Sequence, residues 1–403
     1  MTTASVDLVP HLEARPVSRE LRVAWLFPMM LRTHYWQPVF REFARLVPNS
    51  QVFVGRWGGF AAGYEGTFNL RVIQGARPLV LKKKTNDEQY DSTVYWVPLS
   101  IIKELARFRP DVIFVTGFSA WTACALLCKL ALRARVVVLW DGNSPHWRLQ
   151  ISRLRQFLRR LMAPFFDFVV SNMREGADYM HHVLHVPERK LLSHPYQVAD
   201  REILGSGTND QPLPGRRPRF LFVGSIDPRK GWRYLLEAAR VLVKQGIDQF
   251  SVVFAGSGYQ EQQLYSGIAE NGVSNVAFYV GFVPYYSMAS CYRQADVFVF
   301  PTMDDVWGLV LVEAMTFGKP VICSQYAGAR ELVSDGENGF VVDPRSVEAL
   351  ANSMRKFIED QSLITRFGAR SRELVSPYTP ARAAQVLANV ALETHQSQAA
   401  VTA

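Results

Sequence analysis

The sequence predicts an α/β protein with two doubly wound domains, each a parallel sheet covered by helices on both faces. Short β-branched runs alternate with longer helical patterns along the whole chain, which is typical of strand–helix–strand units. A length of 403 residues fits two domains better than one, and 48% hydrophobic residues are enough for a core in each. A Gly/Pro-rich polar segment at 204–218 separates the halves.

Six strands are expected in each half. In the first half we expect them at 22–27, 51–54, 93–97, 111–116, 135–140 and 166–171. In the second half we expect them at 219–224, 250–255, 276–280, 297–301, 320–324 and 339–342. The resulting division is an N-terminal domain at 19–203, a linker at 204–218, a C-terminal domain at 219–375 and a helix at 376–394 that packs back toward the N-terminal domain. Residues 1–18 and 395–403 are expected to be frayed tails.

The formal net charge of +9 favours anionic partners such as nucleotides, phospholipid headgroups, phosphorylated carriers or nucleic acid, and charge alone does not choose among them. All four cysteines lie in apolar runs (Cys124, Cys128, Cys291 and Cys323), which is typical of buried thiols in a reducing compartment. The uncharged stretch 112–128 is interpreted as a strand, turn and helix, and the start of the chain lacks the features of a signal peptide. A cytoplasmic location is expected.

The first chemical signal is the segment that follows the strand at 219–224. The strand ends at Gly224, a short loop follows, and Lys230 lies directly before a helix. A glycine lets a ligand approach the backbone, and a lysine beside a helix start adds positive charge for a phosphate. An ordinary surface turn would explain the same residues if they stood alone.

The second signal is a pair of carboxylates with seven residues between them. Asp305 is expected in a loop and Glu313 about one turn into the helix that follows. Such acids accept paired hydrogen bonds from vicinal hydroxyls, so two of them can hold a sugar and a ribose. The amides of Gly308 and Leu309 open the helix, where a diphosphate would bind. The alternative is a capped helix with one buried acid, which would need a partner.

This block resembles the signature of the family 4 retaining glycosyltransferases, also called glycosyl transferases group 1. The resemblance covers residues 218–345 and follows the family in order. It includes Gly224…Lys230-Gly231, Gly256-Ser-Gly258, Val280-Gly-Phe-Val283, Ala295-Asp296-Val and the run from Ala327 to Phe340. The resemblance implies the GT-B fold, in which two Rossmann-like domains face each other across a cleft.

The resemblance also implies roles for single residues. Lys230 would bind the diphosphate, Glu313 the ribose hydroxyls and Asp305 the hydroxyls of the donor sugar. The remaining donor-binding residues would be Gly224, Ser225, Arg229, Gly256, Val283, Gly308 and Leu309, with Val283 contacting the base through its backbone. Two departures stand out. Ser225 occupies a position where arginine is common, so that Arg229 would have to replace that charge, and Asp305 is shorter than the usual glutamate.

The expected activity is therefore retaining, metal-independent transfer of a hexose from a UDP- or GDP-linked sugar to a hydroxyl acceptor in polysaccharide or glycolipid assembly. No cofactor, metal or nucleic acid is expected, and no Asp-x-Asp motif occurs. A dinucleotide oxidoreductase is the first alternative, but Glu261 stands where the fingerprint after Gly256 requires glycine. A non-catalytic sugar-nucleotide or lipid-binding module and a nucleotide-sugar epimerase are the others.

The first half gives weaker signals for the acceptor. Asp141 follows the strand at 135–140 and is the candidate for orienting the acceptor hydroxyl, with His146 as an alternative. Asp141 is therefore counted with Lys230, Asp305 and Glu313 among the candidate catalytic residues. His34, in the loop after the first strand, is a further acceptor candidate. Asp141 and His146 could instead be solvated loop residues.

Residues 147–166 predict a basic amphipathic helix. Its apolar stripe consists of Leu154, Phe157, Leu158 and Leu161, and arginines lie mostly elsewhere. The favoured interpretation is a helix that covers the sheet with a solvated basic face. The sharper hypothesis is docking to anionic lipid at the inner face of the membrane, to which residues 82–84 would contribute. The histidines at 181, 182 and 185 are interpreted as exposed helix residues and not as metal ligands.

Overall fold

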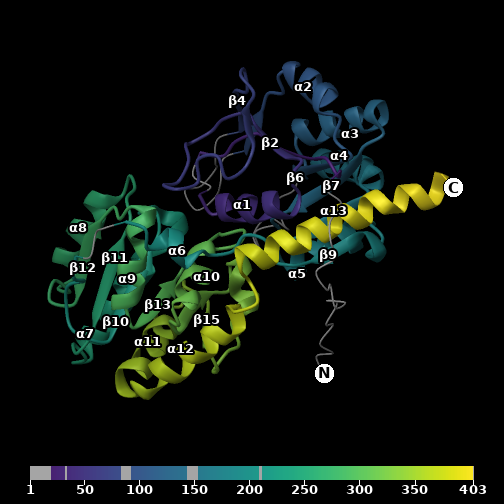
Figure 1. The fold of residues 1–403 in the computed structure, drawn as a ribbon. Helices are drawn as coiled ribbons and strands as arrows, with labels where there is room; N and C mark the ends of the chain where they lie inside the picture. The colour runs from purple at the N-terminus through teal and green to yellow at the C-terminus, as the bar shows by residue number, and fades with distance from the viewer. Residues whose placement is uncertain (1–19, 32–33, 83–91, 143–152, 208–210, 403) are drawn as a thin grey trace.

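The structure is a computed structural model, and it describes residues 20–31, 34–82, 92–142, 153–207 and 211–402. Two parallel sheets form two bodies that lie side by side (Figure 1). The first sheet comes from the N-terminal half and the second from the C-terminal half, as expected from the alternation of strands and helices. The exact limits of the linker and domains stay a prediction.

The N-terminal sheet has the strand order β3-β2-β1-β6-β7-β8-β9. Its strands are β1 (Val23–Phe27), β2 (Ser50–Val54), β3 (Leu70–Val72), β6 (Val112–Thr116), β7 (Arg135–Trp140), β8 (Phe168–Ser171) and β9 (Leu191–Ser193). Strand β1 pairs in parallel with β2 on one side and with β6 on the other. The chain therefore reverses its direction of growth at β1, and ligands of open α/β sheets bind at this kind of switch point.

Two aspects of this half differ from the expectation. The strand expected at 93–97 is β5 (Ser92–Tyr95), which pairs antiparallel with β4 (Pro78–Lys82) outside the main sheet. Strands β3 and β9 were not predicted, because three residues are too few to show alternation of apolar and polar side chains.

Helices cover both faces of the N-terminal sheet. One face packs against α1 (Trp36–Leu46), and the other against α2 (Ser100–Phe108) and α3 (Ala120–Leu132). Two further helices complete this half, α4 (Arg153–Met162) and α5 (Arg174–Asp178). Helix α4 forms only part of the helix expected at 147–166: residues 147–152 lie outside the described part of the chain, and the helix ends at Met162, before a 3₁₀ turn at Ala163–Phe165.

The C-terminal sheet has the order β12-β11-β10-β13-β14-β15 and contains all six strands expected there. They are β10 (Arg219–Val223), β11 (Ser251–Ala255), β12 (Ala277–Gly281), β13 (Val297–Phe300), β14 (Val321–Ser324) and β15 (Gly339–Val342). The direction of growth reverses at β10, which lies between β11 and β13. In both sheets the direction of growth thus reverses at the first strand in the chain, β1 in one and β10 in the other, and ligands of such sheets bind beside this strand.

The helices of this half pack on both faces of the sheet. They are α6 (Arg201–Leu204), α7 (Trp232–Lys244), α8 (Glu261–Glu270), α9 (Met288–Gln294), α10 (Leu309–Thr316), α11 (Val347–Glu359) and α12 (Ser362–Val375). Helices α9 and α10 cover one face, and α7 and α11 cover the other. Loops 224–231 and 301–308 therefore meet at the carboxyl ends of β10 and β13.

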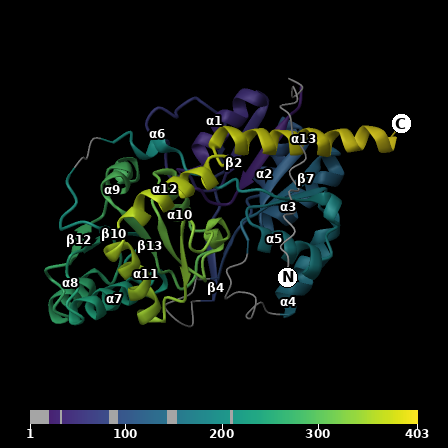
Figure 2. The same cartoon turned by 90° about the horizontal axis from the view of Figure 1, so that it is seen from below.

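The last helix, α13 (Pro380–Thr402), leaves the C-terminal domain and lies along α1 of the N-terminal domain (Figures 1 and 2). Its alanines and leucines are part of the N-terminal core, with Ala384, Leu387 and Ala388 fully buried. The tail expected at 395–403 is wrong as far as Thr402, because the helix continues. Glutamine and alanine, which recur in this segment, have high intrinsic helix propensity.

No helix within the described residues is long and apolar enough to cross a membrane.

Candidate functional site

Lys230 and Asp305 form an ion pair between the loops that follow β10 and β13. Asp227 caps the short 3₁₀ turn Pro228–Lys230, and its side chain accepts a hydrogen bond from the Lys230 amide at 3.2 Å. This cap directs the lysine side chain toward β13. The Lys230 Nζ donates to the Asp305 Oδ2 at 2.5 Å, and both side chains are largely buried. The two residues that the sequence singled out therefore come together across 75 positions of chain.

Arg229 adds a second cation to the same carboxylate. Its Nη1 lies 3.8 Å from the Asp305 Oδ2 and donates to the Asp304 carbonyl oxygen at 3.0 Å. Ser225, at the position where arginine is common in the family, donates its hydroxyl to Asp227 at 2.5 Å. Ser225 thus holds the residue that caps the turn, while Arg229 supplies charge beside Lys230.

The N-terminus of α10 opens beside this ion pair. Gly308 precedes the helix with φ +100°, a conformation that favours glycine, and a Cβ there would lie 2.5 Å from the Phe300 ring. The Lys230 Nζ lies 5.4 Å from the centre of the same ring. Gly308 makes no side-chain cap, and the first turn from Leu309 holds no acid. The amides at the start of α10 and the Lys230 ammonium group therefore both lie beside the Phe300 ring. A helix N-terminus and a nearby cation together suit a bound anion.

Glu313 lies one turn into α10 and is only 2% exposed. Its Oε2 accepts a hydrogen bond from the Tyr292 hydroxyl at 2.7 Å. Burial raises the pKa of the carboxyl to about 7, although the hydrogen bond from Tyr292 acts in the opposite direction. The partner that a buried acid needs is thus Tyr292, which no motif indicated.

The strand-end glycines bring two loops together, backbone against backbone. A Cβ at Gly256 would lie 1.8 Å from the Gly224 carbonyl oxygen, so no side chain fits at position 256, whereas a Cβ at Gly224 would make only ordinary contacts. Val283 follows β12 and is half-buried against the core beneath α9 and α10. The donor-binding residues that the resemblance implied therefore lie on neighbouring loops at one edge of the sheet.

Asp141 lies at the carboxyl end of β7 and is connected to the second domain. The Tyr196 hydroxyl donates to its Oδ1 at 2.6 Å, and burial raises the pKa of the carboxyl. The next residue, Gln197, accepts a hydrogen bond at its carbonyl oxygen from the Trp307 indole at 3.0 Å. Asp141 is thus connected to the segment between Asp305 and Glu313 through Tyr196 and its neighbour Gln197, which contacts Trp307.

Two tyrosines lie between these groups and were missed by sequence reasoning. Burial raises the pKa of Tyr35, and the nearby negative charges of Asp141 and Asp305 raise it further. Burial also raises the pKa of Tyr285, and the Glu313 carboxylate adds to the effect. Acids from both domains therefore face a shared interior. Tyr35 and Tyr285 lie in the loops after β1 and β12. The only sign of them in the sequence is an aromatic residue that follows a predicted strand.

His34 contacts the opposite domain. Its Nδ1 lies 3.2 Å from the Tyr286 hydroxyl, and its ring stacks on Tyr285 with 5.8 Å between centres. Burial lowers the pKa of the imidazole. His146, the other acceptor candidate, lies outside the described residues.

A second set of contacts joins the domains. The Arg174 amide donates to the Glu331 Oε2 at 2.9 Å, and Arg330 forms an ion pair with Glu175. Burial raises the pKa of Glu331 to about 7. Residues of the 327–340 run therefore contact α5 of the N-terminal domain and help to fix the relative position of the two sheets.

Metal ligands do not cluster in the described residues: no three His, Cys, Asp or Glu side chains there could share an ion. The His181 Nδ1 lies 3.0 Å from the Val186 carbonyl oxygen, and its ring packs edge-on against that of His182.

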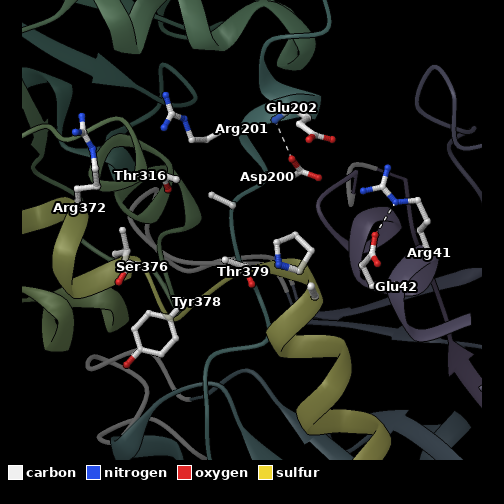
Figure 3. A pocket seen from close by; sticks show the side chains of 14 residues that line it. Arg41, Glu42, Asp200, Arg201, Glu202, Thr316, Arg372, Ser376, Tyr378 and Thr379 are labelled. Carbon is white, nitrogen blue, oxygen red and sulfur yellow. Dashed lines mark hydrogen bonds and ion pairs between the residues drawn. The ribbon is translucent and has the colours of Figure 1, made fainter. Parts of the chain in front are cut away.

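A cavity of about 370 Å³ lies away from the predicted donor residues, where the chain crosses twice between the domains (Figure 3). Arg41 and Glu42 of α1 form one wall, and the others are formed by residues 199–202, by Thr316 and Arg372, and by residues 375, 376 and 378–381. Asp200 accepts a hydrogen bond from the Glu202 amide at 2.8 Å within it. None of the predicted site residues lines this cavity, and the sequence gave no indication of it.

Two family models match successive parts of the chain. The model described as Glycosyltransferase Family 4 matches residues 40–192, and the model described as Glycosyl transferases group 1 matches residues 208–374. A protein with a solved structure, HepE of Anabaena in complex with UDP, is similar in fold, with a TM-score of 0.70 at 16% identity. The match covers 92% of this chain and 99% of that one. The architecture is thus the GT-B fold of glycosyltransferases. The chain belongs to the family 4 glycosyltransferases.

Curated relatives are more similar in sequence and match over shorter regions. The α-D-kanosaminyltransferase of Streptomyces kanamyceticus is 28% identical over 50% of this chain and 52% of its own. The GDP-mannose-dependent α-(1-6)-phosphatidylinositol monomannoside mannosyltransferase of Mycobacterium tuberculosis is 26% identical over 64% of this chain and 70% of its own. The chain spans about half the length of the first of these relatives.

Proposed function

We propose that the protein is a retaining, metal-independent glycosyltransferase that moves a hexose from a nucleotide-sugar to a hydroxyl acceptor. The observation that carries the proposal is the contact of Lys230 and Arg229 with Asp305 at the uncapped N-terminus of α10. Two cations and a helix N-terminus suit a diphosphate, and carboxylates suit the hydroxyls of the attached sugars.

The donor is proposed to be a UDP- or GDP-linked hexose. A structural neighbour holds UDP, and a curated relative is named for its dependence on GDP-mannose. Glu313 would bind the ribose hydroxyls, Asp305 the sugar hydroxyls and the Val283 backbone the base. Gly224, Ser225 and Gly256 would let the diphosphate approach the backbone between β10 and β11, and the amides of Gly308 and Leu309 would donate to it.

The mechanism follows from the charge of the leaving group. As the bond between the anomeric carbon and the phosphate oxygen breaks, negative charge grows on the diphosphate, where Lys230, Arg229 and the α10 amides would stabilise it. The acceptor oxygen attacks on the same face, and its proton passes to the departing phosphate. Asp141 and His34 would orient the acceptor hydroxyl. Retention of configuration is supported by the family resemblance.

Metal independence is supported by the cations that the chain itself places beside Asp305 and by the absence of an Asp-x-Asp motif from the sequence. No cofactor is invoked, because neither the cleavage of the bond to the phosphate nor the attack of the acceptor oxygen needs an electron carrier or a group carrier.

The acceptor is proposed to be a glycan or a lipid-linked glycan in polysaccharide or glycolipid assembly, and not a nucleic acid. The name of the phosphatidylinositol monomannoside mannosyltransferase supports a lipid-linked acceptor. A cytoplasmic location is supported by four cysteines that all remain free, as in a reducing compartment, and a position at the inner face of the membrane is proposed together with the lipid-linked acceptor.

The donor proposal is tested first by ligand-induced thermal stabilisation with UDP, GDP and ADP, since only a bound ligand raises the unfolding midpoint. Hydrolysis of the matching nucleotide-sugar is then followed with EDTA present. Lys230→Met is expected to lower turnover by about 100-fold or more, because one charged contact to the leaving group is lost.

Lys244→Met is the matched control, since Lys244 is exposed at the end of α7. Equal turnover in the Lys230→Met and Lys244→Met proteins would contradict the assignment of Lys230. Nucleotide binding without any turnover would instead indicate a non-catalytic binding module.

A further inference from the structure

Helix α4 is oriented with its apolar stripe toward solvent. The exposed fractions are 68% for Leu154, 61% for Phe157, 48% for Leu158 and 57% for Leu161. Phe165, in the turn that follows α4, is also 57% exposed. The favoured sequence interpretation, in which this stripe covers the sheet, is therefore wrong. Spacings of three and four residues place the four side chains of α4 on one side of the helix.

An arginine takes the place of the apolar side chains on the protein side of α4. Arg159 is 8% exposed, and its guanidinium donates to the Tyr179 hydroxyl at 3.0 Å. The same guanidinium lies 5.1 Å from the centre of the Trp140 ring and 5.2 Å from that of Phe118. The helix is thus anchored by a cation in an aromatic pocket, and this anchoring explains why its leucines face outward.

Positive charge borders the exposed stripe. Arg153 and Arg160 are exposed on the helix, and Arg155 lies on the other edge of the stripe. No aspartate or glutamate occurs in the sequence between Asp141 and Asp167. An apolar stripe with arginines on both edges and no acid matches the interface of an anionic bilayer, where acyl chains lie below phosphate groups.

We propose that α4 and Phe165 form a docking surface for an anionic phospholipid membrane. The helix lies in the plane of the interface, with Leu154, Phe157, Leu158, Leu161 and Phe165 among the acyl chains. Arg153, Arg155 and Arg160 lie at the level of the phosphates. Figure 2 shows α4 at the outer edge of the N-terminal domain, away from the C-terminal sheet.

The anchor places this surface next to the acceptor side of the cleft. Trp140, which contacts Arg159, directly precedes Asp141 in the chain. A membrane bound at α4 would therefore present lipid-linked hydroxyls close to the carboxylate proposed to orient the acceptor. This last step rests on the proposed function, whereas the docking itself does not.

The docking is tested by co-sedimentation of the full chain with vesicles, without any donor or turnover. Vesicles of phosphatidylcholine with about one-third phosphatidylglycerol are compared with pure phosphatidylcholine at low and at high salt. Phe157→Ser/Leu161→Ser is expected to weaken binding to the anionic vesicles by at least about tenfold, because two apolar side chains no longer insert. Arg153→Gln is expected to weaken it by about fivefold, and high salt should weaken it further.

Two matched controls lie in the C-terminal domain. Tyr265→Ser removes a side chain that is 54% exposed, and Arg366→Gln removes an exposed arginine. Both controls should bind as the unaltered chain does. Absence of the unaltered chain from the anionic pellet overturns the proposal, as does equal loss in the controls. A lipid-free dimer that Phe157→Ser/Leu161→Ser dissociates would also overturn it, since the stripe would then be an interface between two copies.

Discussion

At the scale of single residues, Glu313, which we propose binds the ribose, carries a cost in stability. Its carboxyl is buried against Tyr292, and its pKa is raised to about 7 from an ordinary value of 4.5. Ionisation is therefore more favourable in the unfolded chain than in the folded one. Such a penalty is typical of functional groups held in a dry site.

Glu313→Gln is expected to raise the free energy of unfolding by about 3 kcal/mol above pH 7. Between the unfolded pKa near 4.5 and the folded pKa near 7 the unfolded chain binds fewer protons, so the stability of the unaltered protein falls as pH rises. The difference between the two proteins should thus vanish below about pH 4.5. Denaturant titrations from pH 4.5 to 8.5 measure it. A difference that does not change with pH would contradict the burial argument.

Nucleotide binding should depend on the same ionisation. A carboxylate accepts two hydrogen bonds from a ribose, whereas the protonated acid accepts with reduced capacity. We expect the affinity for the preferred nucleotide to fall as pH drops below 7, and calorimetry can follow this fall. Glu313→Gln should flatten the profile, while Glu331→Gln, whose acid also has a pKa of about 7, should leave it unchanged. The opposite result would place the pH dependence at the contact between the domains.

At the scale of elements, the entry into α10 depends on backbone that only glycine provides without strain. Gly308 combines a positive φ with the Phe300 ring in the space of a Cβ. The six strands between residues 219 and 345 could be predicted from the sequence because each follows a strong local pattern. For the same reason, Lys230 and Asp305 could be singled out as candidate site residues. The partners Tyr292, Tyr35 and Tyr285 could not, because they come from separate loops and meet the acids only in the fold.

Gly308→Ala is expected to lower the free energy of unfolding by roughly 3 kcal/mol, from strain and from overlap with Phe300. Gly246→Ala is the control, since Gly246 has φ +79° and open space around its Cβ position. It should cost only about 1 kcal/mol. Chemical denaturation measures both, and equal losses would show that backbone strain alone explains the effect at Gly308.

At the scale of the whole molecule, α13 makes the N-terminal core depend on the end of the chain. The sequence indicated a helix that returns, but its packing on α1 requires the tertiary structure. The same holds for α4, whose amphipathic pattern was clear while its outward orientation depends on the aromatic pocket around Arg159. Local periodicity predicts a stripe, and only the surrounding fold decides which way it faces.

Ala388→Glu is expected to destabilise the protein by several kcal/mol, because it buries a charge between α13 and the N-terminal core. Hydrogen exchange should increase in α1 as well as in α13. Gln396→Glu, at an exposed position of the same helix, should leave exchange and stability unchanged within about 0.5 kcal/mol. Unchanged protection of α1 in the Ala388→Glu protein would contradict the dependence on α13.

The cavity of Figure 3 marks the place where residues 199–202 and 375–381 pass between the domains. A body fastened at two neighbouring points keeps one easy rotation, about the line that joins them, while twisting and sliding are resisted by both. Atoms far from that line then travel farthest for a small change in angle. The two covalent crossings would thus confine to a single path any rotation that breaks the Arg174–Glu331 and His34–Tyr286 contacts between the domains.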